Sequence, residues 1–90
     1  MNSTKQNYFV EMTDTYGGES NYSWVKRFLV KAVSMRGAIS KVTRETGYHA
    51  RLDYETPNIA RYNATSASIC YFVQEAEGNE EEIYSRIVTL

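Results

Sequence analysis

The chain offers few side chains for chemistry, with one histidine, His49, and one cysteine, Cys70. Nucleophilic catalysis needs a nucleophile, a base within hydrogen-bonding reach and a group that orients the base. His49 falls on the polar side of the alternating stretch 48–55, whereas Cys70 lies in the apolar run 69–73, so we do not expect the two to meet. The sequence therefore predicts a protein that is not an enzyme.

Metal and phosphate ligands are equally sparse in the sequence. A structural zinc site needs three or four Cys or His ligands, and the chain has two such residues. The acidic residues do not have the spacing of a calcium loop, and neither a GxGxxG nor a GxxxxGK[ST] phosphate loop is present. We expect neither a metal ion nor a cofactor.

Tyrosine is the residue type best suited to binding here, because eight of the 90 residues are tyrosines. Its side chain combines a large apolar area with a hydroxyl group and loses little conformational entropy on binding. We expect exposed binding anchors at Tyr16, Tyr22 and Tyr62. Tyrosines in apolar strand positions are expected in the core, at Tyr48, Tyr54 and Tyr71.

Basic residues are concentrated in the middle of a chain whose net charge is −1. Residues 24–51 hold seven basic residues against the single acid Glu45, whereas residues 75–90 hold five glutamates against Arg86. We expect the basic side chains that contact a partner to be Arg27, Lys31, Arg51 and Arg61. On an exposed sheet such side chains suit either a protein partner or the phosphates of a nucleic acid.

At this length, residues 1–90 are expected to form one domain, which must position these side chains. The chain is rich in the strand-forming residues Val, Ile, Thr and Tyr and poor in Leu, which favours a sheet. Strands are predicted at 8–13, 21–33, 48–55 and 66–75. Apolar residues at 35, 38, 39 and 42 predict a helix of about 12 residues with Ser34 as N-cap and Gly47 just after its end. Residues 59–65 are ambiguous, and 80–90 form either a strand, which we favour, or a short helix.

This order predicts an α+β fold, a two-layer sandwich in which one helix covers one face of an antiparallel sheet. The sheet is expected to have four or five strands in ββαββ(β) order. The uncovered face should meet solvent or a partner, and we expect it to carry Phe9, Arg27, Lys31, His49 and Arg51. A buried lone cysteine and the absence of an apolar span predict a cytoplasmic protein that does not enter a membrane.

The segments 8–18 and 21–25 and the helix start at 34–42 resemble small accessory proteins of bacteriophages and mobile elements. The resemblance covers roughly the first half of the chain and includes no catalytic motif. It implies a stoichiometric inhibitor of host defence, as the anti-CRISPR proteins are, working in the cytoplasm of the host cell.

The leading hypothesis is a protein-binding module, a phage-type inhibitor that occludes a site on a larger host protein or ribonucleoprotein complex. The alternatives are a small RNA- or DNA-binding module that uses the basic surface between residues 24 and 51, and a sponge for a nucleotide signal. The chain itself is expected to be a monomer or a homodimer.

Overall fold

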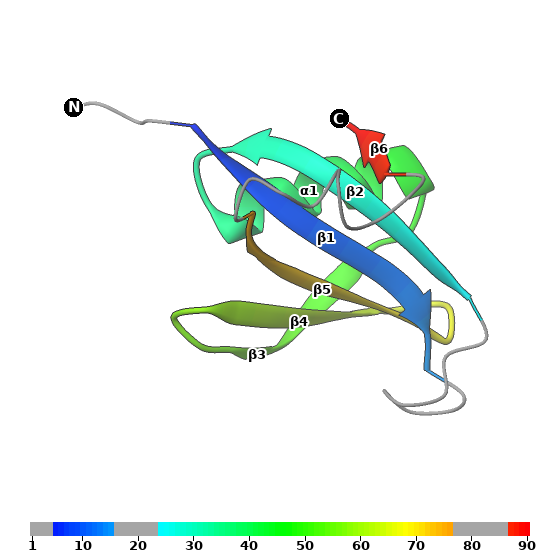
Figure 1. Ribbon diagram of the computed structural model, residues 1–90. Helices are drawn as coiled ribbons and strands as arrows, with labels where there is room; N and C mark the ends of the chain where they lie inside the picture. The colour runs from blue at the N-terminus through cyan, green and yellow to red at the C-terminus, as the bar shows by residue number, and fades with distance from the viewer. Residues whose placement is uncertain (1–4, 16–23, 77–86) are drawn as a thin grey trace.

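The computed structural model describes residues 5–15, 24–76 and 87–90 (Figure 1). Tyr16, Tyr22 and the segment 77–86 therefore lie outside the described residues. The described elements are β1 (Gln6–Asp14), β2 (Val25–Ala32), α1 (Met35–Thr46), β3 (Ala50–Glu55), β4 (Ile59–Ala64), β5 (Ile69–Glu75) and β6 (Ile87–Thr89).

The strands form one sheet in the order β3-β4-β5-β1-β2-β6 (Figure 1). All neighbouring pairs are antiparallel except β2 and β6, which run parallel. In the middle of the sheet, Val10 lies opposite Phe28 on β2 and opposite Val73 on β5. This shared register places three large apolar side chains on the same face of three adjacent strands.

Helix α1 begins and ends at the residues that the sequence predicts. The Ser34 hydroxyl accepts a hydrogen bond from the Gly37 N–H at 3.0 Å, as an N-cap side chain does. Gly47 adopts a left-handed conformation, with φ of 86°, and its N–H donates to the Thr43 carbonyl oxygen at 2.8 Å.

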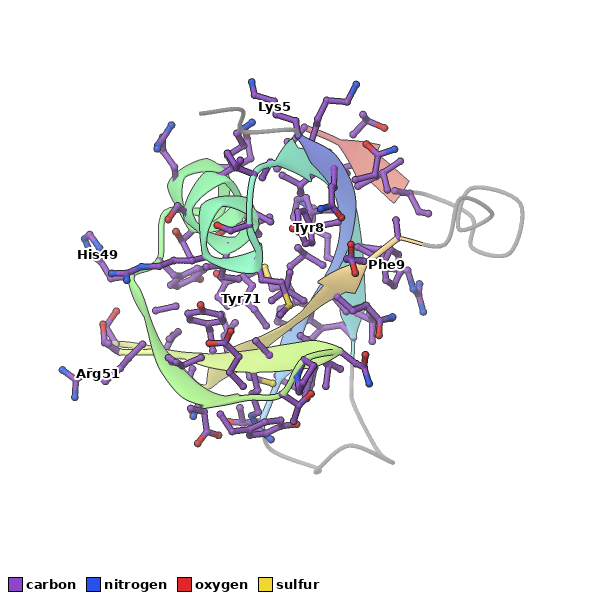
Figure 2. The ribbon with its side chains drawn as sticks, turned by 90° about the vertical axis from the view of Figure 1, so that its left-hand side faces the viewer. Lys5, Tyr8, Phe9, His49, Arg51 and Tyr71 are labelled. Carbon is purple, nitrogen blue, oxygen red and sulfur yellow. The ribbon has the colours of Figure 1, made fainter. Side chains whose placement is uncertain are left out.

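The core lies between α1 and one face of the central strands β1, β2 and β5 (Figure 2). Ala38, Ile39 and Val42 form the buried side of the helix, at the spacing that the amphipathic pattern predicts. The strands contribute alternate residues, including Tyr8, Val10, Phe28, Val30, Tyr71 and Val73. The predicted α+β class with a single helix on one face is thus confirmed for the described part of the chain.

The predicted number and order of strands are wrong. The ambiguous segment 59–65 forms β4, between β3 and β5, which the expected ββαββ(β) order lacked. The last strand, β6, pairs in parallel with β2 at the edge of the sheet opposite β3, whereas the expected sheet was entirely antiparallel. The Leu90 N–H extends this pairing by donating to the Leu29 carbonyl oxygen at 2.8 Å.

Strand β3 departs most from its predicted burial. Its alternation predicts a buried face with Leu52 and Tyr54, yet these side chains are 46% and 41% exposed. Two causes combine: β3 lies at the edge of the sheet beyond the helix, and a β-bulge between the two residues shifts the register. The bulge places Tyr54 opposite Arg61, on the other face from Leu52.

The face of the sheet away from the helix also differs in part from the expectation. Arg27 and Lys31 lie on this face, as predicted, because their strand neighbours Phe28 and Val30 point into the core. Phe9 lies on it as well but is only 2% exposed (Figure 2). His49 does not lie on this face, because it precedes the first residue of β3. Together with Thr43 and other residues near the end of the helix, it lines a shallow hollow.

Candidate functional site in a groove beside the helix

A groove of about 790 Å³ runs between α1 and the outer strands on the helix side of the sheet. It exists because a helix about 10 Å across covers only two to three strands spaced about 4.8 Å apart. The helix packs over β1, β2 and β5, so β3 and β4 extend past it and form the far wall. Its size is within the range of protein sites that hold a small ligand or a short chain segment.

The helix wall and the strand wall both combine apolar and polar side chains. The helix contributes Met35, Arg36, Ile39, Ser40 and Thr43. The strands and the turn between them contribute Tyr8, Ala50, Leu52, Glu55, Pro57, Tyr62 and Glu75. The exposed Leu52 side chain thus lines the same groove as the partly buried Met35, across a gap that the described residues leave unfilled.

Tyr62 is one of two tyrosines in the strand wall, and it is buried, with 8% of its surface exposed. It lies on the helix face because its register partners, Leu52 on β3 and Tyr71 on β5, lie there too. Burial raises the pKa of its hydroxyl above the ordinary 10.0, with a smaller increase from Glu55 and an opposing effect from Arg36. Tyr62 therefore stays protonated at neutral pH and is able to donate a hydrogen bond.

The charges of the groove are unequal. Among the described residues, Glu55 and Glu75 supply two carboxylates, whereas Arg36 supplies one guanidinium group. Both glutamates are exposed, so their charges reach the groove through solvent. This balance favours an occupant with a basic group and disfavours one rich in phosphate.

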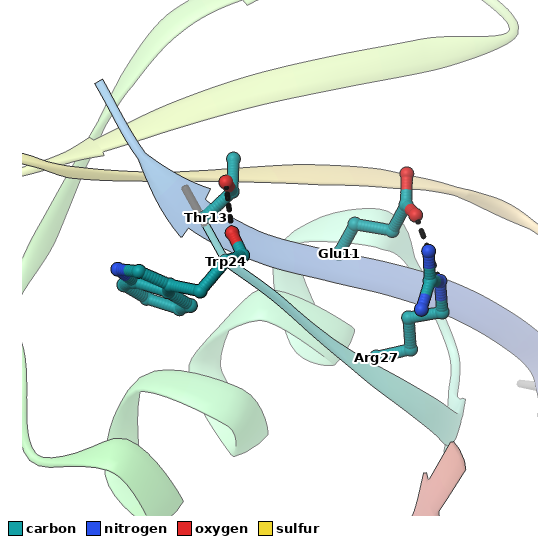
Figure 3. A network of polar contacts seen from close by, with 4 residues as sticks. All are labelled: Glu11, Thr13, Trp24 and Arg27. Carbon is teal, nitrogen blue, oxygen red and sulfur yellow. Dashed lines mark hydrogen bonds and ion pairs between the residues drawn. The ribbon is translucent and has the colours of Figure 1, made fainter. Parts of the chain in front are cut away.

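On the opposite face of the sheet, two basic residues, Arg27 and Arg61, lie in internal contacts, and Figure 3 shows that of Arg27. Arg27 Nε lies 3.1 Å from a carboxylate oxygen of Glu11 on the neighbouring strand. Arg61 Nε lies 3.4 Å from a carboxylate oxygen of Asp53, and its guanidinium group stands 5.4 Å from the centre of the Phe72 ring. These pairs reduce the positive charge that this face offers to phosphates.

The predicted binding residues that the structure describes therefore do not form one cluster. Tyr62 and Arg61 are adjacent in sequence but point to opposite faces of β4, and the expectation that Tyr62 is an exposed anchor is wrong. Lys31 and Arg51 are both exposed, but they lie on β2 and β3, which are separated by three strands. Tyr16 and Tyr22 lie outside the described residues.

The groove residues Arg36, Leu52 and Glu55 were not among the predicted binding residues. Alternation alone predicts that Leu52 is buried, and it does not show how many strands the helix covers. A usable signal was the mismatch between one helix of 12 residues and a sheet of at least four strands. A single helix of that size leaves the outermost strands of such a sheet uncovered.

The side chains best suited to catalysis do not assemble in the described chain. Cys70 is fully buried on β5, as predicted, whereas His49 is exposed beside the helix end. Residues 5–15, 24–76 and 87–90 include no group of three His, Cys, Asp or Glu that could hold a metal ion. Within the same ranges, no helix is long and apolar enough to cross a membrane.

Comparison of the chain with protein families, with characterised proteins and with solved structures finds no match. The groove and the two faces of the sheet are therefore the features from which a function can be inferred.

Proposed function

We propose that the chain is a non-catalytic protein-binding module that holds a segment of a larger protein in the groove between α1 and the β3–β4 hairpin. The observation that carries this proposal is the groove itself, an open volume of about 790 Å³ lined by apolar, hydroxyl and charged side chains. Binding sites for protein segments combine apolar contact area with a few polar groups that fix orientation.

The occupant that fits is an extended segment with a basic side chain next to an aliphatic one. The basic side chain would approach Glu55 and Glu75, and the aliphatic side chain would cover the exposed part of Leu52. The Tyr62 hydroxyl, which is protonated at neutral pH, could donate to a backbone carbonyl of the segment.

The resemblance of the first half of the chain to phage accessory proteins supports a more specific form of this proposal. In that form the bound segment belongs to a host defence protein or ribonucleoprotein complex, and the module inhibits it by occupying a site. A small domain with a closely packed core docks with little rearrangement, which limits the entropic cost of binding.

The observations give less support to the two alternatives. A nucleic-acid platform on the face away from the helix would use Arg27, Lys31 and Arg51, yet Arg27 is paired with Glu11, and the exposed Lys31 and Arg51 lie on strands that are separated by three others. A nucleotide sponge would need several cationic groups in the groove, which has one guanidinium group and two carboxylates.

Selection of a displayed library of random peptides on the folded protein tests the proposal. Enriched peptides should contain Lys or Arg beside an aliphatic residue, and Glu75→Lys should weaken their binding about tenfold or more. Gln74→Lys is the matched control, because Gln74 is the next residue on β5, is exposed and faces the opposite side of the sheet. It should leave peptide binding unchanged.

Two results would contradict the proposal. One is a library that yields no peptide sensitive to Glu75→Lys. The other is salt-dependent retention of RNA or DNA that falls when Arg51 or Lys31 is replaced by Ala, which would favour the nucleic-acid alternative.

A further inference from the structure

Strand β3 has one hydrogen-bonded neighbour, β4, and ends the described sheet on that side. Natural proteins usually protect such an edge, because its unpaired N–H and C=O groups can bind another strand. Strand β3 combines two exposed apolar residues, Leu52 and Tyr54, with a bulge and the charged residues Arg51, Asp53 and Glu55, so it would accept only a strand whose charges match its own. An edge of this kind is suited to pairing with a further strand.

Two hydrogen bonds identify which backbone groups of β3 face outward. The Thr65 N–H donates to the His49 carbonyl oxygen at 2.9 Å, and the Thr56 N–H donates to the Ile59 carbonyl oxygen at 2.8 Å. The backbone hydrogen-bonding groups of His49 and Thr56 therefore point toward β4. In an antiparallel ladder, residues whose N–H and C=O groups point toward the neighbouring strand alternate with residues whose groups point away from it. When this alternation is followed from both ends of β3, with one extra residue at the bulge, the N–H and C=O groups of three residues point outward: Ala50, Leu52 and Glu55.

This outward pattern is symmetric about Leu52. The bulge places Asp53 and Tyr54 at a single step of the ladder, so Ala50 and Glu55 each stand two steps from Leu52. Consider a second copy whose β3 runs antiparallel to the first, related to it by a twofold axis at Leu52. Glu55 of the second copy would then lie opposite Ala50 of the first, and the two Leu52 residues would lie opposite one another. The N–H and C=O groups of all three outward residues would then be paired across the axis.

The side chains are complementary in the same arrangement. On the face away from the helix, Arg51 would lie opposite Asp53 and Tyr54 of the second copy, once on each side of the axis. Each guanidinium group would thus meet a carboxylate and an aromatic ring. On the helix face, the two Leu52 side chains would cover one another, and no pair of like charges is brought together.

We infer that β3 is a dimerisation edge, and that two copies of this chain join through antiparallel β3–β3 pairing centred on Leu52. The inference is separate from the proposed function, because a dimer can form whether or not the groove holds a peptide. Since Leu52 also lines the groove, the second copy would contribute its own Leu52 to the end of each groove.

A charge exchange measured by sedimentation velocity tests this pairing. Arg51→Asp would place carboxylates opposite one another, and Asp53→Arg would place guanidinium groups opposite one another, so each variant alone should dissociate about tenfold or more readily. An equimolar mixture of the two variants should recover the dimer, because in the mixed pair every carboxylate at these positions would face a guanidinium group. The control Lys31→Asp makes a similar charge change on β2, away from the edge, and should dimerise as the natural chain does.

Cysteine crosslinking supplies a second readout that does not depend on charge. Two Leu52→Cys chains would bring their α-carbons about 5.5 Å apart, within the range of a disulfide. Glu55→Cys is the matched control, because its symmetry mate would stand about four residues, or ~14 Å, along the strand. Oxidation should crosslink the first variant and not the second, while the buried Cys70 stays unreactive in both.

A natural chain that sediments as a monomer at every concentration would overturn the inference. So would a dimer that both charge variants keep, or equal crosslinking at positions 52 and 55. The melting temperature of each variant, measured in parallel, ensures that a lost dimer is not a lost fold.

Discussion

A hydrogen bond between Tyr71 and Thr46 joins the end of the helix to the middle of the sheet. The Tyr71 ring is fully buried on β5, and its hydroxyl oxygen lies 2.9 Å from the hydroxyl oxygen of Thr46. Thr46 donates its single hydroxyl proton to the Val42 carbonyl oxygen at 2.8 Å. Tyr71 is therefore the donor in the bond to Thr46, and Tyr71→Phe removes that bond while leaving the ring in place.

We expect Tyr71→Phe to lower the free energy of unfolding by about 0.5–1.5 kcal/mol, the net contribution of one neutral hydrogen bond. The loss should stay in this range because the Thr46 hydroxyl keeps Val42 as its acceptor, so no buried donor is left without a partner. For a domain of this size, a loss of about 1 kcal/mol lowers the melting temperature by roughly 4–8 °C.

Urea unfolding followed by circular dichroism measures this difference, and Tyr54→Phe is the control. Tyr54 is 41% exposed, so loss of its hydroxyl should change stability by less than about 0.5 kcal/mol. Adding Thr46→Val completes a double-mutant cycle, whose coupling energy should also be about 0.5–1.5 kcal/mol. A coupling energy near zero would show that the two hydroxyls do not stabilise the fold together.

Two further predictions concern the glycines and high pH. Gly37→Ala should stabilise the protein by about 0.5–1 kcal/mol in thermal unfolding, because a Cβ there would meet Ser34 and Ala32 only at 3.5 and 3.6 Å. Gly47→Ala should destabilise it by about 1 kcal/mol, because the backbone there has a φ of +86°. The opposite signs would contradict the capping described for α1. Burial raises the pKa of Tyr62 and of Tyr71 above 10.0, so their stabilising effect is complete below about pH 10 and is lost as the pH rises through the folded pKa values. Alkaline unfolding of the variant with both tyrosines changed to Phe should accordingly depend less steeply on pH than that of the natural chain.

The helix and central strands could be predicted from sequence because local signals and tertiary packing agree there. Ser34, Gly47 and the apolar stripe ending at Val42 define one amphipathic helix with both caps. The apolar residues of β5 are buried as their pattern predicts, since this strand is flanked on both sides and covered by the helix. In these elements the local pattern predicts the same buried residues as the packing between distant segments selects.

The edges of the sheet could not be predicted in the same way. β6 consists of three residues and forms through pairing with β2, which is distant in sequence, so no local pattern specifies its direction. Two of the three residues that β4 turns toward the core are alanines, Ala60 and Ala64, so its apolar alternation is weak and its period is ambiguous from sequence. The groove depends on where a helix stops covering a sheet, and that limit is a property of packing between distant segments.

The bulge in β3 explains both the failed prediction for this strand and the form of the groove. In a regular strand, residues two apart share a face, so Leu52 and Tyr54 would lie together and Glu55 would face away. The extra residue reverses the alternation after Leu52, and Glu55 then joins Leu52 in the groove while Tyr54 moves to the face of Arg61. One inserted residue thus places a carboxylate where alternation predicts none, and it makes the outward pattern of β3 symmetric about Leu52.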